Sequence, residues 1–197
     1  MTVGIGNITM TITTIRKLTF DEYLVYHDGT DKRYEFNDGE LVEMPPPIGL
    51  HERIVTFLLV FLSVAAKQKS YPYCVRANGV EIWTGKRTRS PDVCVLSKQQ
   101  ELDILKKAAI LFTPPLLVIE VVSPDYRNVD RQEKLNEYQG IGIFEYWIVD
   151  AALRLISVLH IVNGIYQEAV FYLGDRIISP TFIDLELTVD DVLNADI

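Results

Sequence analysis

The chain has 197 residues, 48% of them hydrophobic, which suits a single domain over 1–197 with one hydrophobic core. Its 19 Lys and Arg against 27 Asp and Glu give a formal net charge of −8, which excludes a uniformly basic nucleic-acid-binding surface, so any contact with phosphates has to be local or metal-mediated. Two cysteines, Cys74 and Cys94, are too few for a disulfide scaffold and lack zinc-site spacing, which favours a reduced, cytoplasmic compartment.

The N-terminal third predicts an extended arm, a short helix and a hairpin. Residues 1–15 alternate Thr with Ile or Met and have no basic targeting region, so we expect an extended arm. Thr19 and Glu22 have capping-box spacing and predict a helix to about Tyr26. An Asp-Gly turn between two alternating segments predicts a hairpin over residues 33–44.

The middle of the chain predicts one long helix followed by strands. The helix is expected from about Leu50 to Lys67 and contains the apolar run 54–66, which is shorter than the roughly 18 residues that span a bilayer. We therefore expect a buried core helix and no membrane partner. Strands are predicted near 75–83 and 93–96, with a short helix around 98–108.

The second half has the pattern of a strand, a helix and a second strand. The apolar run 116–122 predicts a central strand covered on both faces, and a polar helix over about 128–139 leads to a buried strand at 144–150. A hairpin is expected over 154–172 and a helical turn at 189–193. The predicted fold class is α/β (α+β): a mixed central sheet flanked by helices, with N-terminal and C-terminal hairpins.

Glu120 lies inside the apolar run, where an ionised carboxylate is very costly to bury unless a cation or several donors neutralise it. A core glutamate paired with a lysine would explain it. Asp92, between Pro91 and the strand 93–96, stands beside Glu120 if the two strands are neighbours, although a Pro-Asp pair also suits a turn. Two carboxylates with the backbone carbonyl of Val121 suit a hard octahedral cation such as Mg²⁺.

Lys134 is the candidate cation near these carboxylates. Asp130, Lys134 and Tyr138 recur at i, i+4 spacing on one face of the predicted helix. Either Lys134 forms a solvated ion pair with Asp130, or the helix that connects the two buried strands carries this helix face past the end of the strand 116–122. As a lysine on a helix surface, its removal is expected to lower stability by only a few tenths of a kcal/mol.

Five basic residues lie close to the two carboxylates in sequence. They are either ordinary solvated loop residues or substrate-binding cations, and they are Lys86, Arg87, Arg89, Arg127 and Arg131. Other chemistries find no support: the chain has no phosphate-binding P-loop and no nucleophile elbow. His51-Glu52 begins like a zinc-protease motif but lacks the second histidine.

At these residues the chain resembles the Uma family of restriction-endonuclease-like proteins, which is common in cyanobacteria and belongs to the PD-(D/E)XK nuclease superfamily. The resemblance covers most of the chain. The matching blocks are 34–44, His51, 90–93, 115–124, Asp130 with Lys134 and Tyr138, and 145–150. Val122 stands where the E-x-K pattern of the superfamily has its lysine, so Lys134 is the candidate replacement.

The resemblance implies a restriction-endonuclease-like core and a nuclease that uses Mg²⁺ or Mn²⁺ to hydrolyse phosphodiester bonds, with DNA as the expected substrate and the choice between DNA and RNA left open. Asp92, Glu120 and Lys134 are then the expected catalytic residues, and Asp92, Glu120 and the Val121 carbonyl the metal ligands. Further candidates for the metal shell or for holding a water are Glu35, Glu40, His51 and Tyr138. The alternative is an inactive nucleic-acid-binding or protein-interaction module on the same scaffold.

Cleavage of both strands of a duplex by a domain with one site also predicts a homodimer. The hairpin 154–172 or the N-terminal arm could supply an exposed edge for its interface.

Overall fold

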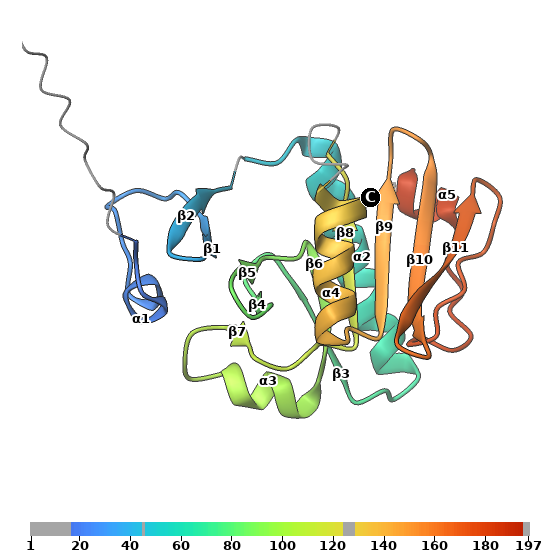
Figure 1. Ribbon diagram of the computed structural model, residues 1–197. Helices are drawn as coiled ribbons and strands as arrows, with labels where there is room; N and C mark the ends of the chain where they lie inside the picture. The colour runs from blue at the N-terminus through green and yellow to red at the C-terminus, as the bar shows by residue number, and fades with distance from the viewer. Residues whose placement is uncertain (1–16, 45, 124–128, 195–197) are drawn as a thin grey trace, which may run out of the picture.

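A six-stranded mixed sheet forms the centre of the computed structural model, which describes residues 17–44, 46–123 and 129–194, with only the backbone of residue 130 (Figure 1). The predicted N-terminal arm lies outside these residues. In spatial order the strands are β11 (Ile165–Tyr172), β10 (Leu155–Val162), β9 (Glu145–Asp150), β8 (Leu117–Val121), β6 (Val93–Ser97) and β3 (Tyr73–Ala77). Strands β8 and β9 run parallel and every other neighbouring pair is antiparallel, which confirms the predicted mixed sheet.

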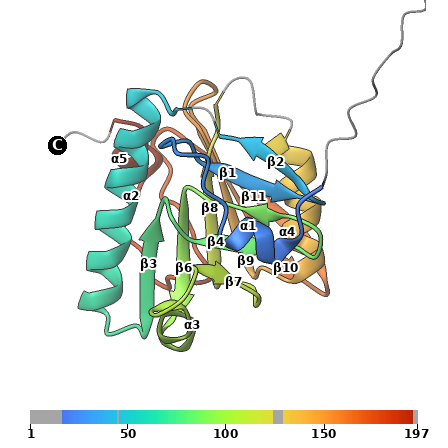
Figure 2. The ribbon, with the colours of Figure 1, turned by 90° about the vertical axis from the view of Figure 1, so that its left-hand side faces the viewer.

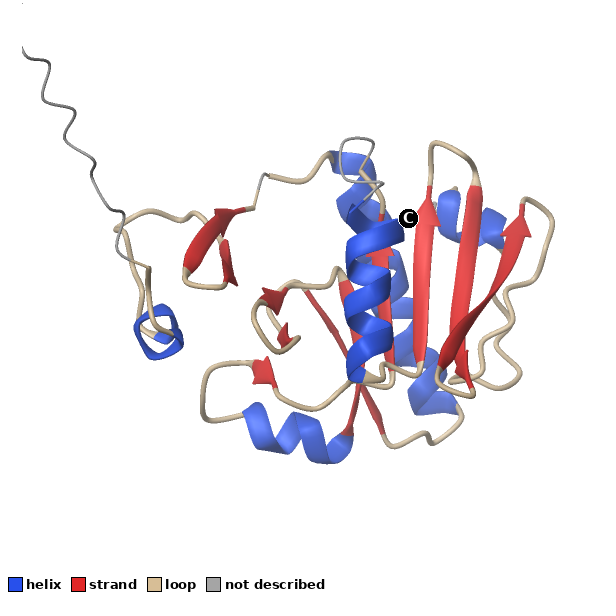
Figure 3. Ribbon diagram, in the orientation of Figure 1, coloured by secondary structure: helices blue, strands red, loops and turns tan. Residues whose placement is uncertain are grey.

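Helices cover both faces of this sheet (Figure 3). The helices α2 (Gly49–Gln68) and α5 (Val189–Leu193) pack on one face, and α3 (Lys98–Ile104) and α4 (Leu135–Ile141) pack on the other. Successive side chains of a strand point to opposite faces. In β8, Ile119 and Val121 join the core under α2, whereas Val118 and the next residue after the strand, Val122, join the core under α4. Glu120 therefore points to the α4 side.

Smaller elements lie outside the six-stranded sheet. They are α1 (Phe20–Leu24), β1 (Tyr34–Asn37), β2 (Glu40–Glu43), β4 (Glu81–Trp83), β5 (Thr88–Arg89) and β7 (Ile110–Leu111). The capping box is confirmed, because Thr19 Oγ1 accepts from Glu22 N at 3.2 Å and a Glu22 carboxylate oxygen accepts from Thr19 N at 2.8 Å. The hairpin β1–β2 is also as predicted. In the small sheet β5-β4-β7, β4 lies inside the predicted strand region 75–83, whereas β5 and β7 were not predicted, because strands of two residues show no hydrophobic period.

The long helix α2 differs from the expected buried core helix. Ile54, Leu58 and Leu62 are fully buried, but Val60 is 57% exposed and Val64 47% exposed. Figure 2 shows α2 along one side of the molecule, next to β3. One side of the helix thus belongs to the core, and the other side exposes Val60 and Val64 together with Thr56 and Ser63. Within the described residues, α2 is the one helix long and apolar enough to cross a membrane, by length and composition alone.

The segment after β8 also differs from the prediction. A regular helix was expected over residues 128–139, but the chain forms a π-helical segment, η2 (Val129–Lys134), which continues into α4. The helix ends at Gly142, whose φ of +82° is favourable for glycine. Single π-helical turns are frequent at functional sites. Lys134 is the last residue of this segment.

Candidate active site

The pairing of β6 with β8 brings Asp92 and Glu120 to the same end of the sheet. In this antiparallel pair Val93 lies opposite Ile119, so the next residues outward are Asp92 and Glu120. Asp92 Oδ2 accepts a hydrogen bond of 2.7 Å from the backbone N–H of Val121. The carboxylate of Asp92 is therefore fixed directly against the end of β8.

Glu120 is only 3% exposed, and both of its carboxylate oxygens have partners. Oε1 accepts a hydrogen bond of 2.7 Å from the Tyr138 hydroxyl, and Oε2 lies 2.8 Å from Lys134 Nζ. Burial, together with the negative charge of Glu120, raises the pKa of Tyr138 well above its ordinary value, so this hydroxyl stays protonated and donates. The buried Glu120 carboxylate thus has both a cation and a hydrogen-bond donor, which offset the cost of burying its charge.

Lys134 is therefore not the surface lysine that the sequence suggested. It is 9% exposed, and its ammonium group contacts a buried carboxylate. The Asp130 side chain, its other predicted partner, lies outside the described part of the chain. Removing Lys134 disturbs a buried charge pair, so the expectation of a loss of a few tenths of a kcal/mol is wrong for this environment.

His51 joins the site from the first turns of α2. Its Nε2 lies 3.1 Å from Asp92 Oδ2, the same oxygen that accepts from Val121. Burial alone would lower the pKa of His51, but the hydrogen bond to Asp92 and the nearby carboxylates outweigh it and raise this pKa. The buried Nδ1 has no hydrogen-bond partner among the described residues, and the nearest carboxylate, of Glu52, lies 3.6 Å away. His51 thus helps to orient Asp92.

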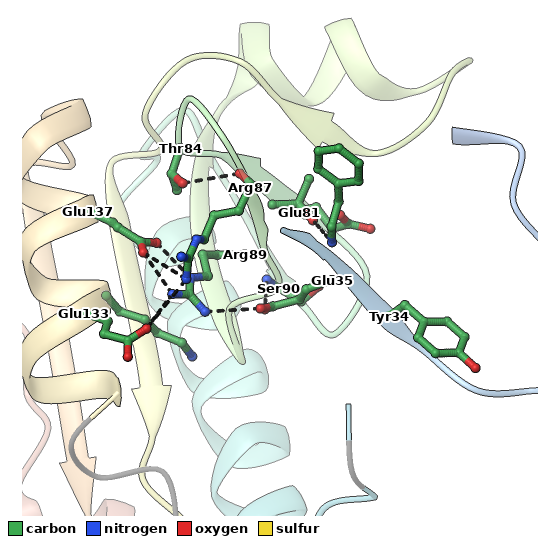
Figure 4. Close-up of polar contacts among 12 residues, drawn as sticks. Tyr34, Glu35, Glu81, Thr84, Arg87, Arg89, Ser90, Glu133 and Glu137 are labelled. Carbon is green, nitrogen blue, oxygen red and sulfur yellow. Dashed lines mark hydrogen bonds and ion pairs between the residues drawn. The ribbon is translucent and has the colours of Figure 1, made fainter. Parts of the chain in front are cut away.

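Glu35 holds the segment that leads to Asp92 (Figure 4). It comes from β1 and is buried. Its Oε1 accepts a hydrogen bond of 2.8 Å from Ser90 N, and its Oε2 lies 3.3 Å from Arg89 Nη1. Ser90 precedes Asp92 by two residues, so Glu35 acts on the position of Asp92 rather than joining it as a neighbouring ligand.

Arg89 links this segment to the helix that carries Lys134 and Tyr138. Its guanidinium donates to both oxygens of Glu137, at 2.8 and 2.9 Å, and lies 3.5 Å from Glu133, as Figure 4 shows. Burial opposes the charged form, but the hydrogen bonds to Glu137 and the charge of Glu35 raise the pKa of Arg89 overall. The side chain is 8% exposed. Arg89 was expected to bind substrate, but its N–H donors face Glu35, Glu133 and Glu137 inside the protein.

The remaining sequence candidates are more dispersed. Arg87 lies 3.3 Å from Glu137, and Arg131 lies 3.4 Å from Glu168. Lys86 and Glu40 line a separate hollow beside the hairpin β1–β2, so the structure does not bring Glu40 to Asp92 and Glu120. Arg127 lies outside the described residues.

A cavity of about 310 Å³ lies beside Asp92, Glu120 and Lys134. Its ionisable lining consists of the carboxylates Glu35, Glu43, Glu52, Asp92, Glu120 and Glu133, the cations Arg33, Arg87, Arg89 and Lys134, and His51. Carboxylates outnumber cationic side chains on this wall. A phosphate group that enters the cavity therefore meets net negative charge unless a cation accompanies it.

The oxygen donors at the base of the cavity match Mg²⁺ in kind. No group of three or more His, Cys, Asp or Glu side chains converges as a metal site within the part of the chain that the structure describes. Mg²⁺, however, usually keeps several waters and takes only one or two carboxylates from the protein. Asp92 and Glu120, adjacent on paired strands, supply such a pair.

Sequence reasoning missed Glu133 and Glu137. Both lie on the same stretch as Lys134, four residues apart, and the alternating charges there resembled a solvated helix face. Their partner Arg89 comes from a distant two-residue strand. The i, i+4 spacing of the two glutamates was the available signal, but it does not reveal which cation they meet.

Comparisons with known proteins show a family and a fold. A family model, Uma2, with the description "Putative restriction endonuclease", matches residues 20–190. An uncharacterized protein from Synechocystis sp. is 25% identical over 142 residues, which cover 72% of this chain and 79% of that protein. A crystal structure described as a "putative nuclease belonging to DUF820" from Anabaena variabilis superposes with a TM-score of 0.73 and 20% identity, over 90% of this chain and 98% of that one. The last similarity shows a shared fold.

Proposed function

Because the chain belongs to the Uma2 family, described as "Putative restriction endonuclease", we propose that it is a divalent-metal-dependent nuclease that hydrolyses phosphodiester bonds in DNA. The family and the nuclease-like fold support a nuclease. The observation that favours the proposal most is the surroundings of Glu120, a buried carboxylate beside Asp92 whose oxygens contact Lys134 and Tyr138. A carboxylate pair with a positioned lysine is the equipment that metal-assisted phosphodiester hydrolysis requires.

Asp92 and Glu120 would hold Mg²⁺ or Mn²⁺, with the backbone carbonyl of Val121 as a further ligand. Within a strand, the N–H and C=O of one residue point to the same side. The N–H of Val121 points to Asp92, so its carbonyl is expected on that side too. When bound, the cation would polarise a phosphoryl oxygen and offset phosphate charge.

Lys134 would act on the phosphate while Glu120 holds its position. Its Nζ has three N–H donors, and the contact with Glu120 Oε2 accounts for one direction. A second donor directed into the cavity would stabilise the negative charge that develops on the phosphoryl oxygens. Tyr138 fixes the other oxygen of Glu120, and His51 fixes Asp92, so both carboxylates are oriented before substrate enters.

The charge of the chain supports a metal requirement. The net charge is −8 and the cavity wall carries more carboxylates than cations, so a bare phosphodiester is repelled. Lys86, Arg127 and Arg131 remain proposed contacts to the nucleic-acid backbone; Arg87 and Arg89 are assigned to the internal ion pairs. We further propose a cytoplasmic protein that acts as a homodimer, since cutting both strands of a duplex requires two sites.

One observation favours the alternative of a non-catalytic module. Arg87 and Arg89, the cations nearest to Asp92 in sequence, are held by Glu133 and Glu137 instead of facing an open surface. A binding module would not cleave DNA when metal is present. The cleavage assay described next therefore separates the two functions.

The test is cleavage of supercoiled plasmid and of end-labelled linear DNA and RNA at low salt with Mg²⁺ or Mn²⁺. Wild type should nick DNA only with metal, and Asp92→Asn, Glu120→Gln and Lys134→Met should each lower the rate about 100-fold or more. Glu186→Gln, which changes an exposed carboxylate on the C-terminal segment, is the matched control and should retain full activity. A folded wild type that cleaves nothing with either metal, or variants as active as wild type, would contradict the proposal.

A further inference from the structure

The outer side of α2 carries a stripe of exposed apolar side chains. The members, here called the outer stripe, are Phe57, Val60, Phe61 and Val64. Val60 and Val64 are exposed, and the half-buried rings of Phe57 and Phe61 stack with centroids 5.6 Å apart. In Figure 2 this helix forms the left edge of the molecule. Phe57 and Phe61 also pack in part against the core that contains Ile54, Leu58 and Leu62, whereas Val60 and Val64 are the exposed members of the stripe.

The spacing of the outer stripe is that of a helix-to-helix contact. Phe57, Val60 and Val64 follow each other at intervals of three and four residues, the spacing of a seam along which two helices pack. Apolar side chains that are exposed side by side on a surface often mark an interaction site. Within the described residues, Val60 and Val64 stay exposed on the outer side of α2, beside the exposed Thr56 and Ser63.

We propose that the outer stripe is the interface through which two copies of this chain associate, α2 against α2. A surface that meets its own copy across a two-fold axis must not place like charges opposite each other. Residues 54–66 contain no Asp, Glu, Lys or Arg, whereas the chain as a whole carries −8 and repels a second copy over most of its surface. The stripe is thus a self-complementary helical surface.

A lipid surface is a poorer occupant for the same stripe. The inner residues Ile54, Leu58 and Leu62 are fully buried, so α2 cannot leave the core without unfolding it. Helices that lie on membranes carry Lys and Arg along their polar side and bind anionic lipids. In α2 the cations are Arg53 and Lys67, on a chain of net negative charge.

The position of the candidate active site indicates a parallel arrangement of the two helices. His51 contacts Asp92 at the N-terminal end of α2, so the cavity opens beside that end. A two-fold axis along the helices would direct both cavities to the same side, where one duplex could reach them. Only the parallel arrangement of the two helices rests on the proposed function; the interface between the helices does not.

The first experiment measures the oligomeric state by light scattering and sedimentation equilibrium. Wild type should be a dimer, and Val60→Glu or Val64→Glu should weaken dimerisation about 100-fold or more, because each places two unpaired carboxylates at the centre of the interface. Ile165→Glu on the edge strand β11, where Ile165 is also exposed, is the matched control and should leave the dimer intact. A monomeric wild type, or a dimer that Ile165→Glu dissociates and Val60→Glu does not, would overturn the proposal.

The second experiment uses milder variants and does not depend on activity. In a Cys74→Ser background, which leaves only the buried Cys94, Val60→Cys and Val64→Cys should each form a disulfide-linked dimer on oxidation if the helices are parallel. Linkage at Val60 alone indicates an antiparallel pair and overturns the parallel arrangement. Co-sedimentation of monomeric wild type with phosphatidylserine vesicles, abolished by Val60→Glu, would assign the stripe to a lipid surface and overturn the proposal.

Discussion

Lys134 and Glu120 form an ion pair inside the protein, with Nζ 2.8 Å from Oε2 and both residues buried. A pair of this kind adds little compared with two apolar residues, but removal of one member leaves an uncompensated charge. The two residues are therefore coupled in stability as well as in the proposed chemistry, and the coupling can be measured without substrate.

Lys134→Met should lower the free energy of unfolding by about 3 kcal/mol, because the Glu120 carboxylate loses its cation in a buried site. The double variant Lys134→Met/Glu120→Gln should recover part of this loss, since the remaining group is neutral. Urea unfolding followed by the fluorescence of buried Trp147 gives both values. A loss within a few tenths of a kcal/mol for Lys134→Met would show that the pair is open to solvent.

Tyr138→Phe should destabilise the protein more than Tyr166→Phe. Each substitution removes one hydroxyl and keeps the ring. The Tyr138 hydroxyl donates to the Glu120 carboxylate at 2.7 Å, whereas the Tyr166 hydroxyl donates to the neutral carbonyl of Ile143 at 2.8 Å. Hydrogen bonds to charged groups contribute about 1.5–3 kcal/mol and neutral ones about 0.5–1.5 kcal/mol. Equal losses in urea unfolding would contradict a charged Glu120 in the folded protein.

The sequence was sufficient to predict a mixed sheet, and it predicted that Asp92 and Glu120 lie side by side if their strands are neighbours. The apolar run around Glu120 is long enough to indicate a strand buried on both faces, and the chain confirms it as β8. Asp92 directly precedes β6, and the observed register places it beside Glu120. The strands could be predicted because hydrophobic periodicity is a local property that burial enforces residue by residue.

The partners of the charged residues could not be predicted in the same way. Arg89 meets Glu137, and Glu35 meets Ser90, across separations of 48 and 55 residues. Such contacts depend on how distant elements are placed in space, which no local pattern records. The burial of Lys134 was missed for a related reason: charged residues at i, i+4 spacing are typical of a solvated helix, and only the crossover from β8 turns this face inward.

Arg89→Met should be far more destabilising than Arg76→Met. Arg89 is buried and contacts three carboxylates, of Glu35, Glu133 and Glu137. Arg76 is an exposed residue of β3 and forms an ion pair with Glu101 of α3. Breaking a buried pair costs about 3–5 kcal/mol, and an exposed pair contributes about 0–1 kcal/mol. Thermal and urea unfolding of both variants measure the difference. Similar losses of unfolding free energy would show that the ion pairs of Arg89 do not hold the hairpin β1–β2 to α4.

Glu145 is a buried group whose ionisation should contribute to the pH dependence of stability. It is fully buried in β9, where its two oxygens accept hydrogen bonds of 2.5 Å from Trp147 Nε1 and 2.7 Å from Thr181 N. Burial raises the pKa of Glu145 above its ordinary value of 4.5, although these hydrogen bonds oppose the rise. The folded protein therefore binds the Glu145 proton more tightly than the unfolded chain does.

The direction of this pH dependence follows from the linkage between proton binding and folding. Between the unfolded and the folded pKa of Glu145, the folded state holds more protons, so the free energy of unfolding decreases as pH rises. The stabilisation is complete below the unfolded pKa and is lost as pH rises through the folded pKa, with a slope of at most about 1.4 kcal/mol per pH unit. Glu145→Gln cannot titrate and should show a flatter curve of unfolding free energy against pH, while losing one acceptor to Trp147 or Thr181. Urea unfolding of wild type and variant from pH 4 upwards, about one unit apart, tests this, and parallel curves would show that Glu145 has the same pKa in both states.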